Sequence, residues 1–125
     1  MRTGKHTVGF NVWDVIKVPF PYVDRPIRQR RPALVIAASD VLTKNRLLWV
    51  AMITSAENRG WDGDVEIIDF ATAGLPSASV VRAAKIVCID ARDAERMGVL
   101  PQGAERRAVA AAVVRQLETL LAEAG

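Results

Sequence analysis

Two nearly continuous apolar runs decide the fold: PALVIAA at residues 32–38 and LLWVAMI at residues 47–53. The first is followed by the polar pair Ser39-Asp40 and the second by Thr54-Ser55. Short runs that are apolar on both faces and rich in Val, Ile and Leu are typical of strands covered on both sides. We therefore predict that these two segments form the central strands of one sheet.

Shorter segments predict the rest of the sheet. The N-terminal one alternates between two faces and ends at Pro19-Phe20-Pro21, because proline cannot donate to a strand ladder. Another follows the turn signal Asp62-Gly63-Asp64 and gives way to a loop at Ala71–Pro76. The predicted outer strands are Trp13–Val18, Val65–Phe70, Ser79–Arg82 and Lys85–Ile89.

The C-terminal part has a different period. From Gly103 onward, apolar residues recur with a helical spacing, which indicates one amphipathic helix packed on the sheet. A shorter helical segment is predicted at Ala91–Met97, stopped by Gly98. The predicted fold class is mostly β with α: a small, twisted antiparallel sheet, a partly closed barrel, with a C-terminal helix. The apolar stripe of that helix consists of Val109, Ala112, Val113, Leu117, Leu120 and Leu121.

Composition limits the possible classes of protein. The chain has 125 residues, half of them hydrophobic, which suits a single domain over 1–125 with residues 1–11 as a disordered N-terminal tail. The single Cys88 and single His6 exclude an internal disulfide and leave no zinc set, so we expect no metal, no cofactor and a reducing compartment. No apolar stretch has the length of a signal or a membrane span, so we expect a soluble cytoplasmic protein.

Positive charge is concentrated in one loop. The excess of 17 Lys and Arg over 14 Asp and Glu permits a polyanionic partner without requiring one. An arginine just before one central strand, with Thr54 and Ser55 at the end of the other, suits a phosphodiester, because guanidinium and hydroxyl groups donate to phosphate oxygens. The alternative is an ordinary solvated loop and hydroxyls that only terminate a strand. The loop arginines are Arg25, Arg28, Arg30 and Arg31.

Five segments in the same order resemble the PemK/MazF family of toxins. The resemblance covers about residues 12 to 121 and implies an SH3-like barrel of the CcdB/PemK type. Members of that family are dimeric endoribonucleases of bacterial toxin-antitoxin modules, and they cut single-stranded RNA at short motifs without a metal. Their partner is an antitoxin whose C-terminal segment covers the RNA groove. The five segments are Val15–Pro21, the Arg31-Pro32 step, Ile53-Thr54-Ser55, Ser79–Arg82 followed by Lys85-Ile86, and Met97–Leu100.

The resemblance implies a chemistry and carries residues with it. Metal-free cleavage uses the 2′-hydroxyl of the RNA as nucleophile and yields a 2′,3′-cyclic phosphate and a 5′-hydroxyl, so the protein shuttles protons and stabilises charge. Arg31 and Thr54 match the principal catalytic positions of the family, and Ser55 is assigned with them. Arg82 matches an arginine that contributes to catalysis or RNA contact in some members, and Ser79 lies in the accompanying RNA-contacting strand.

Three departures from the family pattern stand out. Ala84 replaces an acid that some members carry two residues after the arginine at Arg82. The loop before Arg31 lacks the His or Glu of some members, so Asp24 is its only candidate for a general base, since arginine with a pKa above ~12 is a poor base. Trp13 stands where the family usually has glycine, and we expect it to change packing at the strand start rather than chemistry.

Several residues have a structural interpretation beside the functional one. Arg82 either contacts RNA or pairs with Asp90 or Glu66 across the sheet. Trp61 either stacks on a base or covers an edge of the core. Trp49 is interpreted as core or dimer interface, and Cys88 as buried in a strand.

The hypothesis that follows is a homodimeric, sequence-selective endoribonuclease acting on single-stranded mRNA. Its RNA contacts are assigned to Arg28, Arg30, Ser79, Arg82 and Trp61. The alternative is a non-catalytic CcdB-like toxin or binding module that acts on a protein target such as a topoisomerase, and Ala84 favours it. A DNA-binding regulator ranks lowest, because no helix-turn-helix pattern is present.

Overall fold

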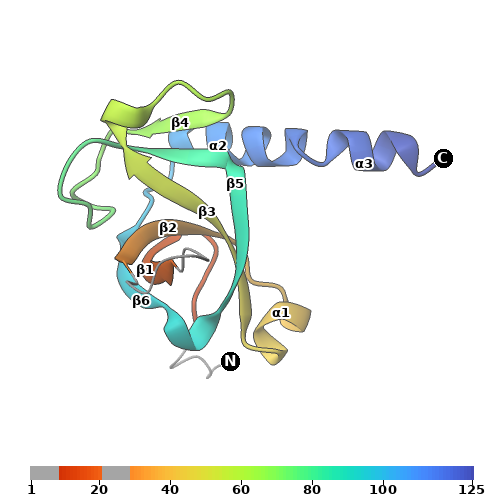
Figure 1. Ribbon diagram of the computed structural model, residues 1–125, viewed down its shortest axis with the longest axis horizontal. Coiled ribbons are helices and arrows are strands. Elements are labelled where there is room, and N and C mark those ends of the chain that lie inside the picture. The colour runs from red at the N-terminus through yellow and green to blue at the C-terminus, as the bar shows by residue number, and fades with distance from the viewer. Residues whose placement is uncertain (1–8, 21–28) are drawn as a thin grey trace.

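The computed structural model describes residues 9–20 and 29–125, which form one six-stranded antiparallel sheet with helices at its margins (Figure 1). The strand order is β4-β5-β3-β2-β1-β6. The strands are β1 (Asp14–Phe20), β2 (Gln29–Ala37), β3 (Leu47–Ser55), β4 (Asp64–Ile67), β5 (Ser79–Asp90) and β6 (Glu95–Val99). The helices are α1 (Asp40–Lys44), α2 (Ala104–Arg115) and α3 (Glu118–Glu123), with the short 3-10 turns η2 (Ala56–Asn58) and η3 (Ala91–Asp93).

The two long apolar runs form the two middle strands, β3 and β2, as their composition predicts. Alternate residues of these strands enter two separate hydrophobic clusters, because successive side chains of a strand point to opposite faces. Leu34 and Ala51 belong to the first cluster, which also contains Val109 of α2. Val35 and Val50 belong to the second cluster, on the opposite face of the sheet.

A bend in β5 closes part of the sheet into a barrel. The register between β3 and β5 shifts at the step from Ala51 to Met52, whose partners are Ile86 and Arg82. Residues 83–85 of β5 are therefore extra, and such bulges bend a strand and increase its twist. Figure 1 shows β5 running along the top of the molecule and then turning down beside β3. The predicted fold class, a partly closed antiparallel barrel with a C-terminal helix, is confirmed.

The segment predicted as helical at Ala91–Met97 is helical only in its first three residues and enters a strand at Glu95, so the prediction of one helix was wrong. Only η3 is helical, and β6 follows it and pairs with β1 at the edge of the sheet. Pairing with β1 supplies the backbone hydrogen bonds that a helix would otherwise make, and no local pattern reveals such a long-range partner. The strand predicted at Val65–Phe70 ends at Ile67, since the Ile68 amide donates instead to Glu105 of α2 at 3.0 Å.

Cys88 is exposed on β5, contrary to the prediction that it is buried. Trp49, which faces it across the β3–β5 pair, is also 43% exposed. The exposure of Cys88 corrects the prediction. The apolar composition of a strand does not show which of its two faces the rest of the protein covers.

The predicted C-terminal helix is divided in two. Val109 and Ala112 of α2 are buried against the sheet. Around Gln116 and Leu117 the amides bond three residues back instead of four, and α3 begins after this tightened turn. In Figure 1, α3 projects beyond the sheet, and none of its residues is buried. Only the first half of the predicted apolar stripe therefore packs on the sheet.

Residues 9–11 lead into β1 along the barrel. Phe10 packs against the second hydrophobic cluster, and the Arg96 guanidinium lies 5.2 Å from the centre of its ring. The Asn11 amide donates to the Asp14 carboxylate at 2.8 Å, and Arg96 donates to the same carboxylate at 2.7 Å. Of the described helices, none has both the length and the apolar character needed to cross a membrane.

Trp13 adopts a left-handed backbone conformation, with φ of +83°. Its amide donates to the Val35 carbonyl and its carbonyl accepts from the Leu100 amide, both at 2.9 Å. The indole packs against the first cluster and lies 5.3 Å from the Arg106 guanidinium. Glycine adopts this φ without steric cost, so tertiary contacts hold a bulky residue in a conformation that glycine would take freely.

This strain predicts an order of stability for two variants. Both Trp13→Ala and Trp13→Gly remove the indole contacts, but only alanine keeps the steric penalty of a positive φ. We expect Trp13→Gly to be more stable than Trp13→Ala by about 1 kcal/mol, measured by urea unfolding. Equal stability of the two variants, or the reverse order, would contradict a strained Trp13.

Candidate functional site

A small polar pocket of about 120 Å³ lies where β2, β3 and β5 meet. Three cationic side chains and one hydroxyl line it, and none of the described lining residues is acidic. Such a concentration of donors favours an anionic ligand. The lining residues are Arg31, Met52, Ile53, Thr54, Arg82 and Lys85.

Strand register brings the predicted pair Arg31 and Thr54 together. Ala33 of β2 faces Met52 of β3, and the same register continued by two residues places Arg31 opposite Thr54. Arg82 of β5 faces Met52 from the other side. Ala33 and Met52 belong to the second hydrophobic cluster, so the three polar side chains continue that face of the sheet beyond the end of its apolar part.

Lys85 is a pocket residue that the sequence analysis did not select. In a regular strand, Arg82 and Lys85 would point to opposite faces, because they are three positions apart. The extra residues of the β5 bulge change this alternation, and both side chains line the same pocket. The available signal was the interruption between the predicted strands Ser79–Arg82 and Lys85–Ile89.

Thr54 and Ser55 have different roles, although they are neighbours. The Thr54 hydroxyl oxygen accepts a hydrogen bond from the Asn58 side-chain amide at 3.0 Å, which leaves the hydroxyl proton to be donated elsewhere. Ser55 lies outside the pocket and caps η2, its Oγ accepting from the Glu57 amide at 3.3 Å. The strand-terminating interpretation therefore describes Ser55, and Thr54 is the hydroxyl beside Arg31.

Arg82 pairs with Asp64 of β4, and neither of the predicted partners is used. Its Nε donates to Asp64 Oδ1 at 3.1 Å and its Nη2 to Asp64 Oδ2 at 3.0 Å. Nη2 also donates to the Asn58 carbonyl at 2.7 Å. The bond from Arg82 is the main reason why the pKa of Asp64 is lowered from its ordinary value. Asp64 therefore stays ionised at neutral pH and is a weak proton acceptor.

The same arginine supports Trp61 on the loop between β3 and β4. The Arg82 guanidinium lies 4.1 Å from the centre of the indole ring, a cation–π distance. The amides of Gly60 and Trp61 both donate to Asp64 Oδ2 at 3.1 Å, which fixes the loop. Trp61 remains 53% exposed, so it is not a core residue. Arg82 thus connects the pocket with an exposed aromatic ring.

The other predicted site residues lie apart from this pocket. Arg30 donates to the Glu95 carboxylate at 2.9 Å and to the Lys17 carbonyl at 3.4 Å, on the face of β2 opposite Arg31. Ser79 is buried opposite Ser55 and donates to the Ser77 carbonyl at 3.0 Å. Asp24 and Arg28 lie outside the described residues.

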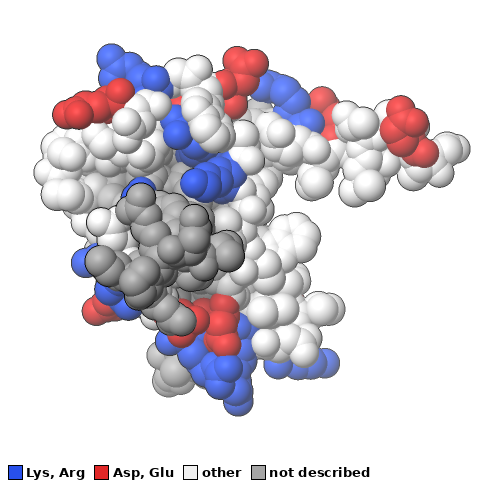
Figure 2. Space-filling model, in the orientation of Figure 1, with Lys and Arg blue, Asp and Glu red and all other residues white. Residues whose placement is uncertain are grey.

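Positive charge collects near the pocket on the molecular surface. In Figure 2, Lys and Arg side chains gather over the region where β5 bends. Within residues 9–20 and 29–125, no group of three or more His, Cys, Asp or Glu side chains is arranged to hold a metal ion.

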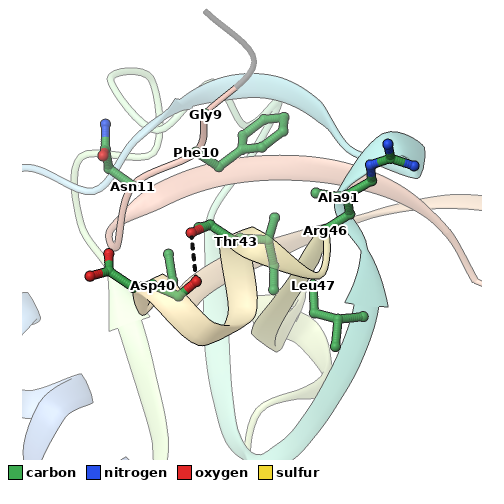
Figure 3. Close-up of a pocket in the computed structure, with 10 residues that line it drawn as sticks. Gly9, Phe10, Asn11, Asp40, Thr43, Arg46, Leu47 and Ala91 are labelled. Atoms are coloured by element: carbon green, nitrogen blue, oxygen red, sulfur yellow. Dashed lines mark hydrogen bonds between the residues drawn. The ribbon is translucent and has the colours of Figure 1, made fainter. Parts of the chain in front are cut away.

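A second pocket, of about 590 Å³, lies at the other end of β3 (Figure 3). Phe10, Leu47 and Ala91 line it together with the charged Asp40 and Arg46 of the α1 region. Leu47, the lining residue at the start of β3, is seven positions from Thr54, which corresponds to roughly 23 Å along a strand. None of the predicted site residues that the structure describes lines this pocket. It is therefore a separate feature from the cationic pocket.

Comparisons with known proteins agree with the fold. A family model described as "PemK-like, MazF-like toxin of type II toxin-antitoxin system" matches residues 11–122. The structure of MazF from Deinococcus radiodurans (Form-I) matches with a TM-score of 0.64 and 24% identity, over 90% of this chain and 96% of that chain. The MazE-MazF structure from the same organism (Form-II) matches with a TM-score of 0.61 and 22% identity, over 89% and 93% of the respective chains.

A third structure, Mycobacterium tuberculosis toxin MazF-mt6, has a TM-score of 0.59 and 24% identity, over 82% of this chain and 95% of that chain. At these levels of identity the structural matches show a common fold. No curated protein sequence matches the chain.

The Asp64–Arg82 pair predicts a pH-dependent stability. Because the folded pKa of Asp64 is lowered, its contribution is fully present above the ordinary value of 3.8 and is lost as the pH falls through the folded value. Asp64→Asn should therefore be less stable than the wild type at neutral pH, and the difference should narrow below pH 3.8. Urea unfolding of both proteins across this range measures it.

Asp62→Asn is the matched control, since Asp62 is an exposed carboxylate in the same turn. It should unfold like the wild type throughout. A difference between wild type and Asp64→Asn that does not change with pH would show that the Asp64 charge contributes nothing to folding.

Proposed function

Because the chain belongs to the PemK-like, MazF-like toxin family of type II toxin-antitoxin systems, we propose that it is an endoribonuclease that cleaves single-stranded mRNA at selected sequences. The observation that carries the proposal is the pocket in which Arg31, Thr54, Arg82 and Lys85 converge. A phosphodiester group offers non-bridging oxygens to several donors at once, and this pocket presents donors from three strands. No cofactor is part of the proposal.

The proposed reaction is an internal transesterification. The 2′-oxygen of the RNA attacks the adjacent phosphorus, an O2′–P bond forms and the P–O5′ bond breaks. The 2′-hydroxyl loses its proton, the departing 5′-oxygen gains one, and the products are a 2′,3′-cyclic phosphate and a 5′-hydroxyl. Negative charge grows on the non-bridging oxygens in the transition state, so fixed cations around them lower the barrier.

Each pocket residue has a part in this reaction. Arg31 presents a planar fork of donors to the non-bridging oxygens and stays protonated at neutral pH. Thr54 donates its hydroxyl to the same phosphate while Asn58 holds its oxygen in place. Lys85 adds a second positive charge at the pocket wall. Arg82 adds a third, oriented by Asp64.

The proton acceptor is assigned to Asp24. Asp64, the carboxylate bonded to Arg82, is unsuited to this role because its pKa is lowered. In the sequence, Asp24 precedes β2 and Arg31. As a carboxylate it can accept the 2′-hydroxyl proton when placed within hydrogen-bond reach.

The CcdB-like alternative is less well supported. It depends on Ala84, where some family members have an acid near the arginine. In this chain a carboxylate reaches Arg82 from the neighbouring strand through Asp64. Arg82 therefore has an acidic partner despite the alanine, and we favour the nuclease.

We further propose two protein partners. One of the matching structures is that of MazE-MazF from Deinococcus radiodurans. By analogy, we propose that this chain binds a cognate antitoxin in the cytoplasm. The second partner is another copy of the chain. Helices of six residues, such as α3, are marginal in water unless they pack on something. The apolar side chains that a second copy would cover are Val114, Leu117, Leu120 and Leu121.

Arg31→Ala tests the catalytic proposal. We expect its cleavage of a mixed RNA pool in EDTA to fall at least about 100-fold, because one transition-state donor is removed. The wild type should leave 2′,3′-cyclic phosphate ends, identified by mapping of the end chemistry. Circular dichroism and the unfolding midpoint should be unchanged.

Arg92→Ala is the control for loss of one positive charge. Arg92 pairs with Asp90 at the far end of β5, away from the pocket. It should cleave like the wild type. Full activity of Arg31→Ala, or wild-type products with 5′-phosphate and 3′-hydroxyl ends, would refute the assigned chemistry.

The dimer is tested on α3 and on Leu117, the residue just before it. Replacing Leu117 and Leu121 together by glutamine removes two exposed apolar contacts, 43% and 75% exposed in the single chain. We expect the wild type to elute as a dimer and the double variant to shift to the mass of a monomer, measured by size-exclusion chromatography with light scattering. Glu118→Gln in the same helix should remain dimeric. A monomeric wild type would refute the proposed interface.

A further inference from the structure

We propose that Trp61 is the stacking platform of a subsite for one unpaired nucleobase of the RNA, next to the cationic pocket, and that Glu66 selects a base with an exocyclic amine. This inference rests on the proposed function and adds a base-selecting site to it. It is carried by the contacts of Trp61 and by the residues around it.

The platform is held rigidly on one side. Arg82 lies over the indole at 4.1 Å, and its guanidinium is bound by both oxygens of Asp64 and by the Asn58 carbonyl. The side chains of Arg82 and Asp64 are only 11% and 7% exposed. The Trp61 amide is bonded to the same carboxylate. An aromatic side chain fixed in this way loses little conformational entropy when a base stacks on it.

The exposed part of Trp61 lines an open depression of about 720 Å³. A half-exposed indole on a surface loop buries its apolar area best against another flat ring. Every nucleobase has such a face, and stacking on aromatic side chains is a general mode of binding single-stranded nucleic acid. The depression is lined by Arg59, Gly60, Trp61, Asp64, Glu66 and Val80.

The depression is joined to the cationic pocket through a continuous set of contacts. Thr54 in the pocket accepts from the Asn58 side chain, and the Asn58 carbonyl accepts from Arg82. Arg82 lines the pocket and lies over Trp61. A nucleotide with its phosphate at Thr54 thus has a stacking surface for a neighbouring base within the same network.

The charge of the depression favours a base over an acidic peptide. Its charged lining residues are Arg59, Asp64 and Glu66, and the exposed Glu66 carboxylate repels the carboxylates of an acidic peptide. Asp64 is already engaged by Arg82, whereas Glu66 is exposed on the edge strand β4. A carboxylate accepts from the exocyclic amine of cytosine, adenine or guanine. Uracil has no exocyclic amine, so Glu66 discriminates against it.

Binding of 2′-O-methyl RNA oligonucleotides tests the subsite. These oligonucleotides lack the nucleophilic hydroxyl, so they bind without being cleaved. We expect Trp61→Ala to weaken binding about tenfold, as loss of one base stack does, and Trp61→Phe to retain most of the affinity. Glu66→Gln should reduce the preference for cytosine- over uracil-containing oligonucleotides. Wild-type tryptophan fluorescence should be quenched on binding, and Trp61→Phe should lose that quenching.

Ile68→Ala is the matched control, since Ile68 follows β4 and is 79% exposed but does not line the depression. It should bind like the wild type. Unfolding midpoints near the wild-type value show that each variant is folded. A wild type that cleaves RNA, with Trp61→Ala unchanged in affinity and site selection, would overturn the subsite alone. A wild type that neither binds nor cleaves RNA would overturn the subsite and the proposed function together.

Discussion

The extra residues of β5 opposite the Ala51–Met52 step are the constraint on which the rest of the molecule depends. β5 pairs with β3 on both sides of the bulge, and only its first part, Ser79–Arg82, also pairs with β4. The same bulge brings Lys85 onto the face that already carries Arg82. The bend of the barrel and the positive charge of the pocket therefore have one structural cause, and a bulge beside a functional site is a recurrent feature of β-proteins.

Arg82 illustrates how a buried ion pair can serve geometry more than stability. Removing a guanidinium and a carboxylate from water has a large cost, and their attraction offsets it only when geometry is good and the remaining donors are satisfied. Here the Nε and Nη2 atoms of Arg82 donate to the Asp64 carboxylate, and Nη2 also donates to the Asn58 carbonyl. The result is an arginine with a fixed direction, which presents charge to the pocket on one side and supports Trp61 on the other.

The two halves of the C-terminal region show how far one chain completes its own packing. Val109 of α2 is part of the first hydrophobic cluster, together with strands β1, β2 and β3. The leucines of α3 follow the same helical spacing but extend past the sheet. A helical period in the sequence therefore marks an apolar face without stating which molecule covers it. In this protein, α2 packs on the core of its own chain, and we propose that a second copy of the chain packs on α3.

The sequence by itself determined the central strands, the antiparallel half-barrel and the C-terminal helical segment, because apolar runs and periodicity are local properties of the chain. The resemblance of its motifs to a toxin family also predicted Arg31 and Thr54 as a catalytic pair. Only the tertiary structure decided that residues 95–99 form a strand, since their hydrogen-bond partners on β1 are some 80 residues away in sequence. Likewise, Asp64 as the partner of Arg82 and Lys85 as a pocket residue follow from strand register and from a bulge. Those features depend on contacts between distant segments, which a local pattern does not encode.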